Sequence, residues 1–428
     1  MRTKAAQLAE PGDQIRRPCK LKVLLSAYSC EPGKGSEPGI GWHWAVEIAR
    51  LGHEVHVLTR ANNVSAIERG LAALDGVQAH IHGYDLPRWA RWWKKGVRGV
   101  HLYYLLWQWY AYRQARKLHA QEGFDLVHHI TIGVYRHPSF MGGLGIPFIF
   151  GPIGGGEYSP PALLRSVLRS ARIYEFLRST ANRIAAFDPL VRSTFRHASL
   201  ILCKTQETMA AVPLEMRKKC ICLLEVGIDP VLMAQLPSAG SERPQFLFAG
   251  RLVYWKGIHL IFPALKQVRQ DVPDATLTIV GEGKDRAWLQ TVAQHCGVGD
   301  SVEWPGWVPR EKLIQLYGRY TAFVFPSLHD SSGNFVVEAI SQGLPVICLD
   351  VGGPGAILPD NCGFKIAAWD RTEEQVVSAL AAAMKQLACN SALRRELAEN
   401  ALAAARVKTW KAVVGHAYEQ VEKVLVSR

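Results

Sequence analysis

The feature that most constrains the fold is an alternation of short apolar runs with longer segments of helical character, which occurs in both halves of the chain. The apolar runs are rich in β-branched and aromatic side chains, as is typical of strands buried on both faces of a parallel sheet. They cover residues 21–27, 55–58, 125–130, 146–151 and 200–203 in the first half, and 245–250, 275–281, 321–326 and 344–349 in the second. Two such units in series predict an α/β chain of two doubly wound domains, with ligands at the carboxyl ends of the strands and in the cleft between the domains.

Length and charge agree with two domains of different character. A chain of 428 residues has room for two or three domains, and its 48% hydrophobic and 20% charged residues exclude a disordered protein. The net charge of +13 is uneven, because residues 1–240 hold 30 Lys and Arg against 18 Asp and Glu, whereas residues 241–428 hold 20 against 19. This split favours different partners for the two halves.

We expect four units along the chain. They are a flexible leader over 1–20, a first, acceptor-side domain over 21–238, a second domain over 239–409 and a terminal helix over 410–428. One apolar stripe runs along the terminal helix, formed by Val414, Tyr418, Val421 and Leu425, and it predicts that this helix packs back toward the first domain. The leader has no apolar core of signal-peptide type, no run reaches about 18 apolar residues, and the nine Cys form no C-x-x-C pair. These features predict a cytoplasmic protein with free thiols.

The segment AGRLVYWKG, residues 249–257, places two cations where a predicted strand ends and a helix begins. Arg251 follows the strand, and Lys256 opens the helix expected from about residue 257. Two cations beside a helix N-terminus suit a diphosphate, which binds converging charge-assisted donors. Taken alone, the pattern fits better a solvated surface pair, or one bridged to Glu282.

A second segment, residues 326–347, combines two carboxylates with the start of a helix. Asp330 and Glu338 stand on either side of a turn at Gly333, and a helix is expected over 334–342. The first amides of that helix are free to bind an anion. Glu338 lies about one turn into the helix and can accept both hydroxyls of a ribose, although a solvated Glu is the commoner case.

In their order and spacing, these segments resemble the family 4 retaining glycosyltransferases, which have the GT-B fold. The family pattern is G-R-L-x-x-x-K-G, followed by E-x7-E-A-x-x-x-G-x-P-V. The matching residues here are Gly250, Arg251, Leu252, Lys256 and Gly257, then Asp330, Glu338, Ala339, Gly343, Pro345 and Val346. In the first half, residues 31–59 and 151–157 resemble a sub-branch with an S-E-P-G-x-G-W loop. The resemblance implies two Rossmann-like domains that face a central cleft.

The resemblance also implies roles for the charged residues of the second domain. Arg251 and Lys256 would neutralise the departing diphosphate, and Glu338 would hold the ribose. Asp330 would contact hydroxyls of the transferred sugar. It stands where the family usually carries Glu, and a side chain shorter by one methylene leaves the identity of that sugar open.

The remaining donor-binding residues are implied in the same way. The amides of Gly333, Asn334 and Phe335 would cap a phosphate. Glu282, in the segment IVGEG, and Val308, in PGWVP, would complete the donor site, with Val308 near the nucleotide base.

In the first half, Gly39 and Gly41 are expected to open a helix after Pro38, so that the backbone can approach the phosphates closely. His128 and His129 end a predicted strand that faces the cleft, and the resemblance implies that one of them reaches the donor sugar. For each of the two, a hydrogen-bonded structural His is an equal alternative.

The sequence contains no D-x-D pair of the kind that holds a divalent metal on a sugar nucleotide. We therefore expect no metal and no cofactor, with Arg251 and Lys256 supplying the positive charge at the phosphates. No carboxylate in the motifs is an obvious nucleophile, which favours retention by same-face attack. The substrates would be a GDP-, UDP- or ADP-linked sugar and a glycan or lipid-linked acceptor.

The acceptor side carries a basic stretch rich in Trp. Residues 85–121 hold eight Lys or Arg with one acidic residue, together with Trp89, Trp92, Trp93, Trp107 and Trp109. Seven Arg between residues 165 and 196 extend the bias. Interleaved Trp and basic residues suit binding to the anionic lipids on the inner face of the cell membrane. The alternative, of equal weight, is a helix of the acceptor-side domain whose aromatic side chains belong to the core. No nucleic-acid module is visible, so we expect no nucleic-acid partner.

The leading hypothesis is a metal-independent retaining hexosyltransferase that acts in polysaccharide or glycoconjugate biosynthesis. A sugar-nucleotide epimerase of the same fold is the first alternative, and it would convert its donor without an acceptor. The second is a non-catalytic partner subunit, which the unusual Asp330 motivates and which nucleotide release in the presence of an acceptor would exclude.

Overall fold

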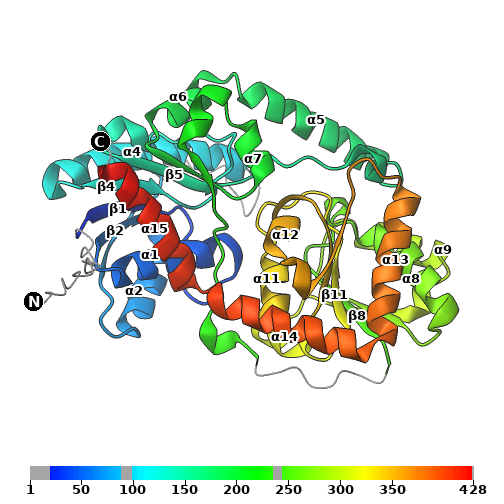
Figure 1. The fold of residues 1–428 in the computed structure, drawn as a ribbon. Coiled ribbons are helices and arrows are strands. Elements are labelled where there is room, and N and C mark those ends of the chain that lie inside the picture. Colours follow the sequence, from blue (N-terminus) through cyan, green and yellow to red (C-terminus); the bar gives the residue numbers. More distant parts are fainter. Residues whose placement is uncertain (1–19, 88–98, 235–242, 427–428) are drawn as a thin grey trace, which may run out of the picture.

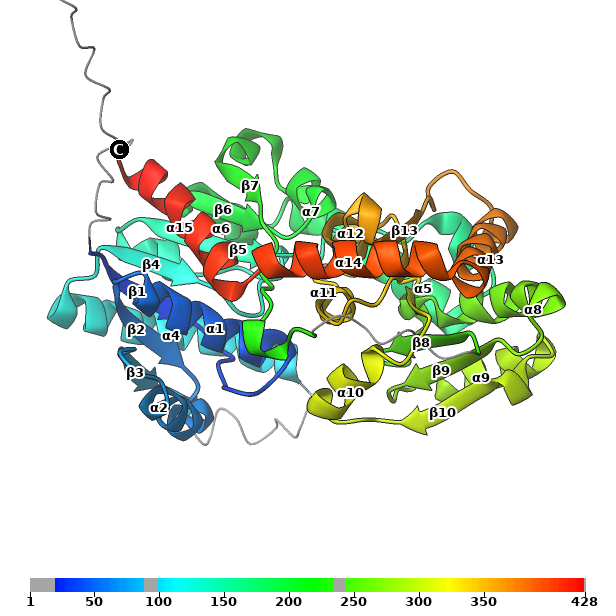
Figure 2. The ribbon, with the colours of Figure 1, turned by 60° about the horizontal axis from the view of Figure 1, so that its bottom comes forward.

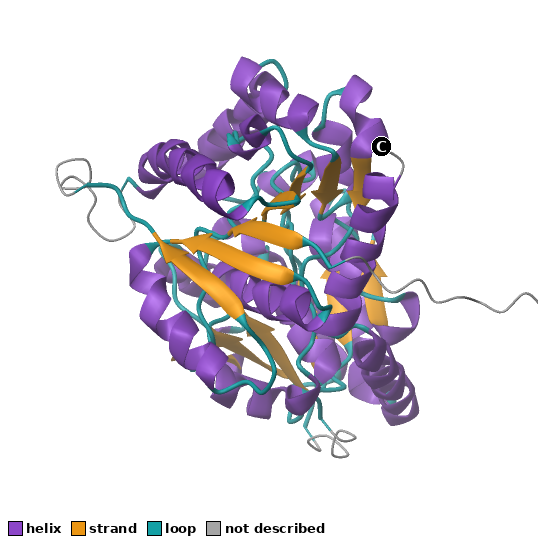
Figure 3. Ribbon diagram, turned by 90° about the vertical axis from the view of Figure 1, so that its left-hand side faces the viewer, coloured by secondary structure: helices purple, strands orange, loops and turns teal. Residues whose placement is uncertain are grey.

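The computed structural model describes residues 20–87, 99–234 and 243–426, and two separate parallel sheets form its framework (Figure 1). The strand order is β3-β2-β1-β4-β5-β6-β7 in the first sheet and β10-β9-β8-β11-β12-β13 in the second. The strands pair in parallel throughout. Helices cover the strands on both sides (Figure 3), so the predicted α/β fold with two doubly wound domains is confirmed.

The strands differ in how visible they are in the sequence. The first sheet contains β1 (Lys22–Ser26), β2 (Glu54–Thr59), β3 (Ala79–Gly83), β4 (Leu126–His129), β5 (Phe148–Ile153), β6 (Leu200–Cys203) and β7 (Cys220–Cys222). The second contains β8 (Gln245–Ala249), β9 (Thr276–Val280), β10 (Val302–Gly306), β11 (Ala322–Phe325), β12 (Val346–Leu349) and β13 (Gly363–Ile366). The apolar runs predicted every central strand, and the strands they missed, β3, β7, β10 and β13, are the edges of the two sheets. Edge strands are partly exposed and need no continuous apolar run.

The helices alternate with the strands. The first domain contains α1 (Ser36–Arg50), α2 (Val64–Ala72), α4 (Val100–Glu122), α5 (Arg169–Ala185), α6 (Pro189–His197) and α7 (Gln206–Ala211). The rest are α8 (Ile261–Asp271), α9 (Arg286–His295), α10 (Arg310–Tyr317), α11 (Asn334–Ser341), α12 (Gly352–Ile357), α13 (Glu373–Cys389), α14 (Ser391–Val407) and α15 (Trp410–Val426). Two predicted starts are corrected: α1 begins at Ser36 rather than Gly39, and α8 begins only at Ile261, after two short 3-10 turns.

The last helix returns to the first domain. Although α15 follows α14 of the second domain, it packs against α1 of the first (Figures 1 and 2). Its buried stripe includes Val414, Tyr418 and Val421, and the Tyr418 hydroxyl lies 3.3 Å from Nδ1 of His128 on β4. The chain therefore passes between the domains twice, once after β7 and once before α15.

Helix length and composition also bear on membrane spanning. No single helix among the described residues is both long and apolar enough to cross a membrane. The helices α13 and α14 satisfy that requirement only when taken together, as a pair bent by 101°.

The turn before α8 depends on one glycine. Gly257 has a φ of 68°, in the left-handed region, and a Cβ at this position would overlap the carbonyl oxygen of Pro326. This close approach holds the segment that carries Lys256 against the end of β11. Gly123, at the end of α4, has a similar φ of 66° but open space around the position of a Cβ.

We expect Gly257→Ala to destabilise the protein much more than Gly123→Ala. Both substitutions put an alanine in a left-handed conformation, which costs about 1–2 kcal/mol. Only Gly257→Ala adds a collision with backbone that cannot move aside. Thermal unfolding followed by circular dichroism measures the two shifts, and equal shifts would show that the contact with Pro326 is unimportant.

Candidate functional site

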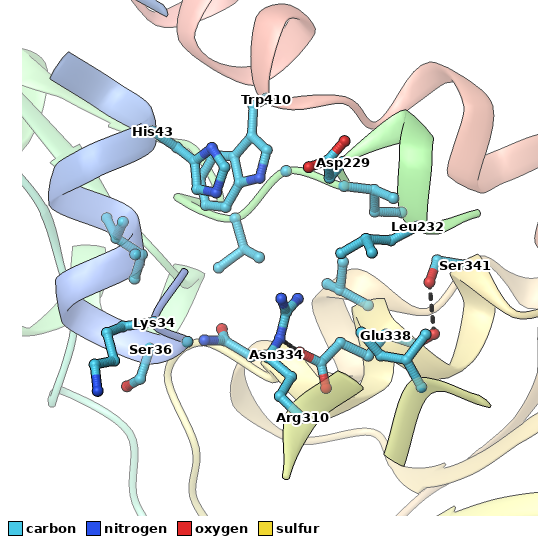
Figure 4. A pocket seen from close by; sticks show the side chains of 18 of the residues that line it. Lys34, Ser36, His43, Asp229, Leu232, Arg310, Asn334, Glu338, Ser341 and Trp410 are labelled. Carbon is cyan, nitrogen blue, oxygen red and sulfur yellow. Dashed lines mark hydrogen bonds and ion pairs between the residues drawn. The ribbon is translucent and has the colours of Figure 1, made fainter. Parts of the chain in front are cut away.

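A pocket of about 310 Å³ opens between the two domains (Figure 4). Its lining includes residues 33–36 with Gly39, Ile40 and His43 of the first domain, residues 226–229 of the connection, Arg310, Asn334, Val337 and Glu338 of the second domain, and Trp410 of α15. Three residues predicted to bind the donor are among them, namely Gly39, Asn334 and Glu338. The structure therefore joins parts of the two predicted motif regions that are about 300 residues apart in sequence at one site.

Glu338 faces this pocket with a cationic partner. Its Oε1 lies 2.6 Å from Nε of Arg310, which comes from α10 (Figure 4). Burial raises the pKa of Glu338 above its ordinary value, although Arg310 acts in the opposite direction. The carboxylate keeps 15% of its side-chain surface exposed, so it can accept hydroxyl donors from a ligand in the pocket.

An aromatic wall closes the opposite side. The rings of His43, on α1, and Trp410, at the start of α15, stack with centroids 4.3 Å apart and planes 7° apart (Figure 4). Burial lowers the pKa of His43 to about 4, so this imidazole is neutral at pH 7. The sequence motifs did not indicate either residue, because the contact joins helices at opposite ends of the chain.

Lys256 and Asp330 form an ion pair with each other. Lys256 also lies over the ring of Phe325, with Nζ 4.8 Å from the centroid. Burial would raise the pKa of Asp330, but the Lys256 ammonium outweighs it and holds that pKa below its ordinary value. Within this pair, Asp330 lies three residues before Gly333, the N-cap of α11, whose φ is 60°. A fixed cation and the first amides of α11 therefore flank the same loop.

Two glycines of α1 are needed for close backbone packing. A Cβ at Gly39 would overlap the carbonyl oxygen of Lys34, and a Cβ at Gly41 would overlap that of Ser29. Gly39 also lines the pocket, whereas Gly41 lies against the loop that follows β1. Glycine here lets the loop fold back on the first turns of α1.

A buried lysine links the two domains at the bottom of the cleft. Lys204, directly after β6, has its Nζ 2.6 Å from Oε1 of Glu225 and 3.7 Å from Oε1 of Glu37. It also donates to the Ser332 hydroxyl at 3.4 Å, and that hydroxyl donates to Glu225 at 2.6 Å. Burial would lower the pKa of Lys204, but the two carboxylates outweigh it and raise that pKa.

A second cross-domain contact lies beside it. The Ser331 hydroxyl donates to Oε2 of Glu157 at 2.7 Å and accepts from the amide of Gly155 at 3.0 Å. The sequence analysis missed both networks. A signal was present, because Lys204 and Glu157 follow the apolar runs of β6 and β5, where ligand-binding residues of such sheets gather.

Several predicted residues lie elsewhere. Arg251 is exposed at the end of β8, Glu282 pairs with Arg286 of α9, Val308 packs against the core, and Phe335 packs near Phe325. None of these predicted residues lines the pocket described above. Their assignment to the donor site stays a prediction.

The placement of His128 and His129 corrects the sequence analysis. Both are fully buried, and neither lines the cleft pocket. His128 bonds to the carbonyl of Gly151 at 2.8 Å, and His129 bonds to the hydroxyls of Tyr104 and Ser139 at 3.0 and 2.9 Å. The prediction that one of them faces the cleft is wrong for this structure, because partners from remote helices and loops occupy the ring nitrogens.

The basic stretch rich in Trp has two characters. Trp89, Trp92 and Trp93 lie outside the described residues. Within α4, Trp107 is buried in the core and donates to the carbonyl of Tyr84, whereas Trp109 is 48% exposed. Core packing therefore accounts for Trp107 but not for the exposed Trp109.

One group of side chains in the described part of the chain has the spacing of a metal site. Glu54, His56 and His80 lie on β2 and β3, with their ligand atoms within 4.8 Å of one another. They are not part of the pocket lining, and Glu54 already pairs with Lys22 at 3.0 Å. The expectation of a metal-free cleft stays a prediction.

The buried His129 gives the fold a predicted pH dependence. Burial lowers its pKa to about 3, below the value of about 6.5 expected in the unfolded chain. The unfolded state therefore binds the proton first, and stability that is present above pH 6.5 is lost as the pH falls, by about 1.4 kcal/mol per unit. In His129→Gln, which keeps hydrogen-bonding groups without titrating, the unfolding midpoint in urea should fall less between pH 7 and pH 5. The same fall in both proteins would contradict this role.

Known glycosyltransferases are similar in sequence to the second domain. A family model described as glycosyl transferases group 1 matches residues 235–403. Glycogen synthase from Mycobacterium tuberculosis is 32% identical over 171 residues, which are 39% of this chain and 39% of the relative. The match thus spans about two fifths of that relative's length.

Solved structures resemble both domains. WaaG, a glycosyltransferase involved in lipopolysaccharide biosynthesis, matches with a TM-score of 0.58 at 19% identity and covers 92% of this chain and 98% of its own. HepE from Anabaena, in complex with UDP and glucose, matches with a TM-score of 0.58 at 17% identity and covers 95% of this chain and 100% of its own. At these identities the likeness concerns the fold. The second domain is thus similar to the glycosyl transferases group 1 family, and the chain as a whole shares the two-domain GT-B fold of these solved glycosyltransferases.

Proposed function

We propose that this protein is a retaining glycosyltransferase that moves a hexosyl unit from a sugar nucleotide to a glycan or lipid-linked acceptor, at the cytoplasmic face of the cell membrane. The observation that carries the proposal is the meeting of Gly39, Asn334 and Glu338 in one pocket between the domains. The similar HepE structure contains UDP and glucose, which supports a sugar nucleotide as the donor class.

The pocket accounts for the nucleoside end of the donor. The Glu338 carboxylate would accept hydrogen bonds from the ribose hydroxyls. One of its oxygens, Oε1, already accepts from Arg310. The diphosphate would lie toward the start of α11, where the first amides and Lys256 converge. Asp330 would then exchange part of its contact with Lys256 for a hydroxyl of the transferred sugar.

The proposed reaction depends on charge stabilisation. Departure of the nucleoside diphosphate leaves negative charge on the phosphates and an oxocarbenium-like sugar. The Lys256 ammonium is 12% exposed and held beside an aromatic ring, so it would stabilise this charge more strongly than a solvated lysine. A phosphate oxygen on the same face would assist deprotonation of the acceptor, which gives retention.

A donor screen tests the proposal directly. Sugars linked to UDP, GDP and ADP are added singly, and the true donor should raise the thermal unfolding temperature because it binds only the folded state. Release of the nucleotide only when an acceptor is present would support transfer. Conversion of the donor to an epimer without an acceptor would support the epimerase instead, and binding without any turnover would support the partner subunit.

We expect Lys256→Ala to fold and to lose about 100-fold in kcat, because one charged donor at the developing charge is removed. The matched control is Lys385→Ala, which breaks an exposed pair of 2.7 Å with Asp271 in the same domain and should keep normal turnover. Activity should also survive excess EDTA. Near-normal turnover of Lys256→Ala, or a loss with EDTA that Mg²⁺ restores, would contradict the proposed mechanism.

Substitutions of Asp330 and Glu338 should weaken the binding of different ligands. Asp330→Ala should lower turnover of the full donor by about two orders of magnitude but hardly change binding of the bare nucleoside diphosphate, which lacks the sugar. Glu338→Ala should weaken both ligands, because its carboxylate lines the nucleoside pocket. Calorimetric titration with each ligand measures the difference. An equal loss for the bare nucleotide in Asp330→Ala would assign that carboxylate to the nucleotide pocket or to the fold.

A further inference from the structure

Helix α5 buries polar side chains against the rest of the protein and exposes apolar side chains to solvent. It runs along the edge of the first domain toward the second (Figure 1). On the buried face, Glu175 and Arg178 form an ion pair of 2.5 Å, and Glu175 also accepts from the Tyr254 hydroxyl at 2.9 Å. Asn182 donates to the carbonyl of Gly155 at 3.0 Å. Buried polar groups of a surface helix need such partners, and here they are satisfied.

The opposite face is apolar and open. The exposed side chains and their exposed fractions are Ile173 (62%), Phe176 (68%), Leu177 (60%), Ile184 (62%) and Phe187 (79%), the last just beyond the helix. Their spacing of three, four and seven residues places them in one stripe, directly opposite the buried polar face. A contiguous apolar stripe of this kind on a soluble domain marks an interaction surface.

The charges beside the stripe indicate what it contacts. Arg169, Arg172 and Arg183 are exposed, and helical spacing puts Arg172 and Arg183 along one edge of the apolar stripe and Arg169 at its start, in line with Phe176. The only acidic residue of α5 is Glu175, which is buried and paired. Just beyond the helix, the exposed Asp188 follows Phe187 and accepts from the first amides of α6. Apolar side chains with three arginines beside them and no exposed carboxylate within the helix itself complement the boundary between headgroups and acyl chains of an anionic membrane.

We propose that α5 is the membrane-docking element of this protein, with its apolar stripe inserted into an anionic lipid surface and its three flanking arginines on the headgroups. This inference rests on the proposed function in one respect: docking at the membrane would bring a lipid-linked acceptor to the cleft. The geometry serves that purpose: the inner face of the same helix contacts Tyr254, two residues before Lys256. The lipid surface and the proposed diphosphate site therefore lie on opposite sides of one helix, whose diameter is about 10 Å.

Sedimentation with vesicles tests the proposal. The full chain is mixed with vesicles of phosphatidylcholine alone or with phosphatidylglycerol added, at increasing salt. Binding should require the anionic lipid and fall as salt rises, because screening weakens the attraction. Phe176→Ser with Leu177→Ser should reduce binding about tenfold or more, since the inserted apolar surface is lost. Replacing the three flanking arginines with glutamine should also reduce binding and flatten the salt dependence.

The control variant removes equally exposed apolar side chains elsewhere. Leu214 and Val407 are 75% and 74% exposed, and serine at both positions should leave vesicle binding unchanged. If Phe176→Ser with Leu177→Ser binds like the unmodified protein, α5 is not the docking element. If sedimentation equilibrium instead shows a dimer that this variant dissociates, the stripe binds a second copy and the proposal is also wrong.

The outcome can be separated from that of the proposed function. Each variant is also tested for the thermal shift caused by nucleoside diphosphate, which α5's outer face should not affect. Vesicle binding through α5 without recognition of any sugar nucleotide would uphold the docking surface and refute the donor assignment. Donor binding with no vesicle binding in the unmodified protein would refute the docking surface alone.

Discussion

The geometry of the cleft depends on one ammonium group that is almost shielded from water. Lys204 is 5% exposed and is paired with Glu37, in the first turn of α1, and with Glu225, in the loop after β7, and it also donates to the Ser332 hydroxyl of the other domain. Removing one partner of such a buried pair typically costs about 3–5 kcal/mol, because the remaining charge is left unpaired. The next residue after Ser332 is Gly333, which sets the start of α11 and thereby the positions of Asn334 and Glu338. A charge cluster that does not line the pocket thus helps to position residues that do.

The central strands of the two parallel sheets could be predicted from the sequence, whereas the contacts between the two domains could not. Central strands are buried on both faces, so their apolar runs are visible without any knowledge of the fold. Glu338 and Asn334 could be placed because helix geometry and a glycine turn fix them locally. His128 and His129 could not be placed, because their hydrogen-bond partners come from other elements of the fold: Tyr418 from the last helix, 290 residues away, and Tyr104 from α4, 25 residues away. The networks of Lys204 and Glu157 escaped notice for the same reason.

Three of the charged groups assigned to the donor, Lys256, Asp330 and Glu338, are already paired within the protein. Glu338 contacts Arg310, and Asp330 contacts Lys256. Such pairs keep each carboxylate and ammonium oriented and satisfied while the pocket is free of ligand, so no isolated charge is left in a partly buried site. Under the proposed function, preference for one sugar nucleotide would depend on how well its hydroxyls and phosphates replace these internal partners. Affinity in such a site reports an exchange of contacts rather than a simple gain.

The two passages of the chain between the domains run side by side. The amide of Ile228, in the first connection, donates to the carbonyl of Lys408 in the second at 2.9 Å, and Ile228 bridges Thr409 as a pair of parallel strands would. A Cβ at Gly227 would overlap the backbone of Trp410, so the two strands lie in close contact. The two connections are therefore held against each other by backbone contacts rather than crossing between the domains as two independent linkers. Because Trp410 forms part of the pocket wall, the paired connections and the pocket share a surface. A molecule that fills the pocket would therefore contact the paired connections that join the two domains.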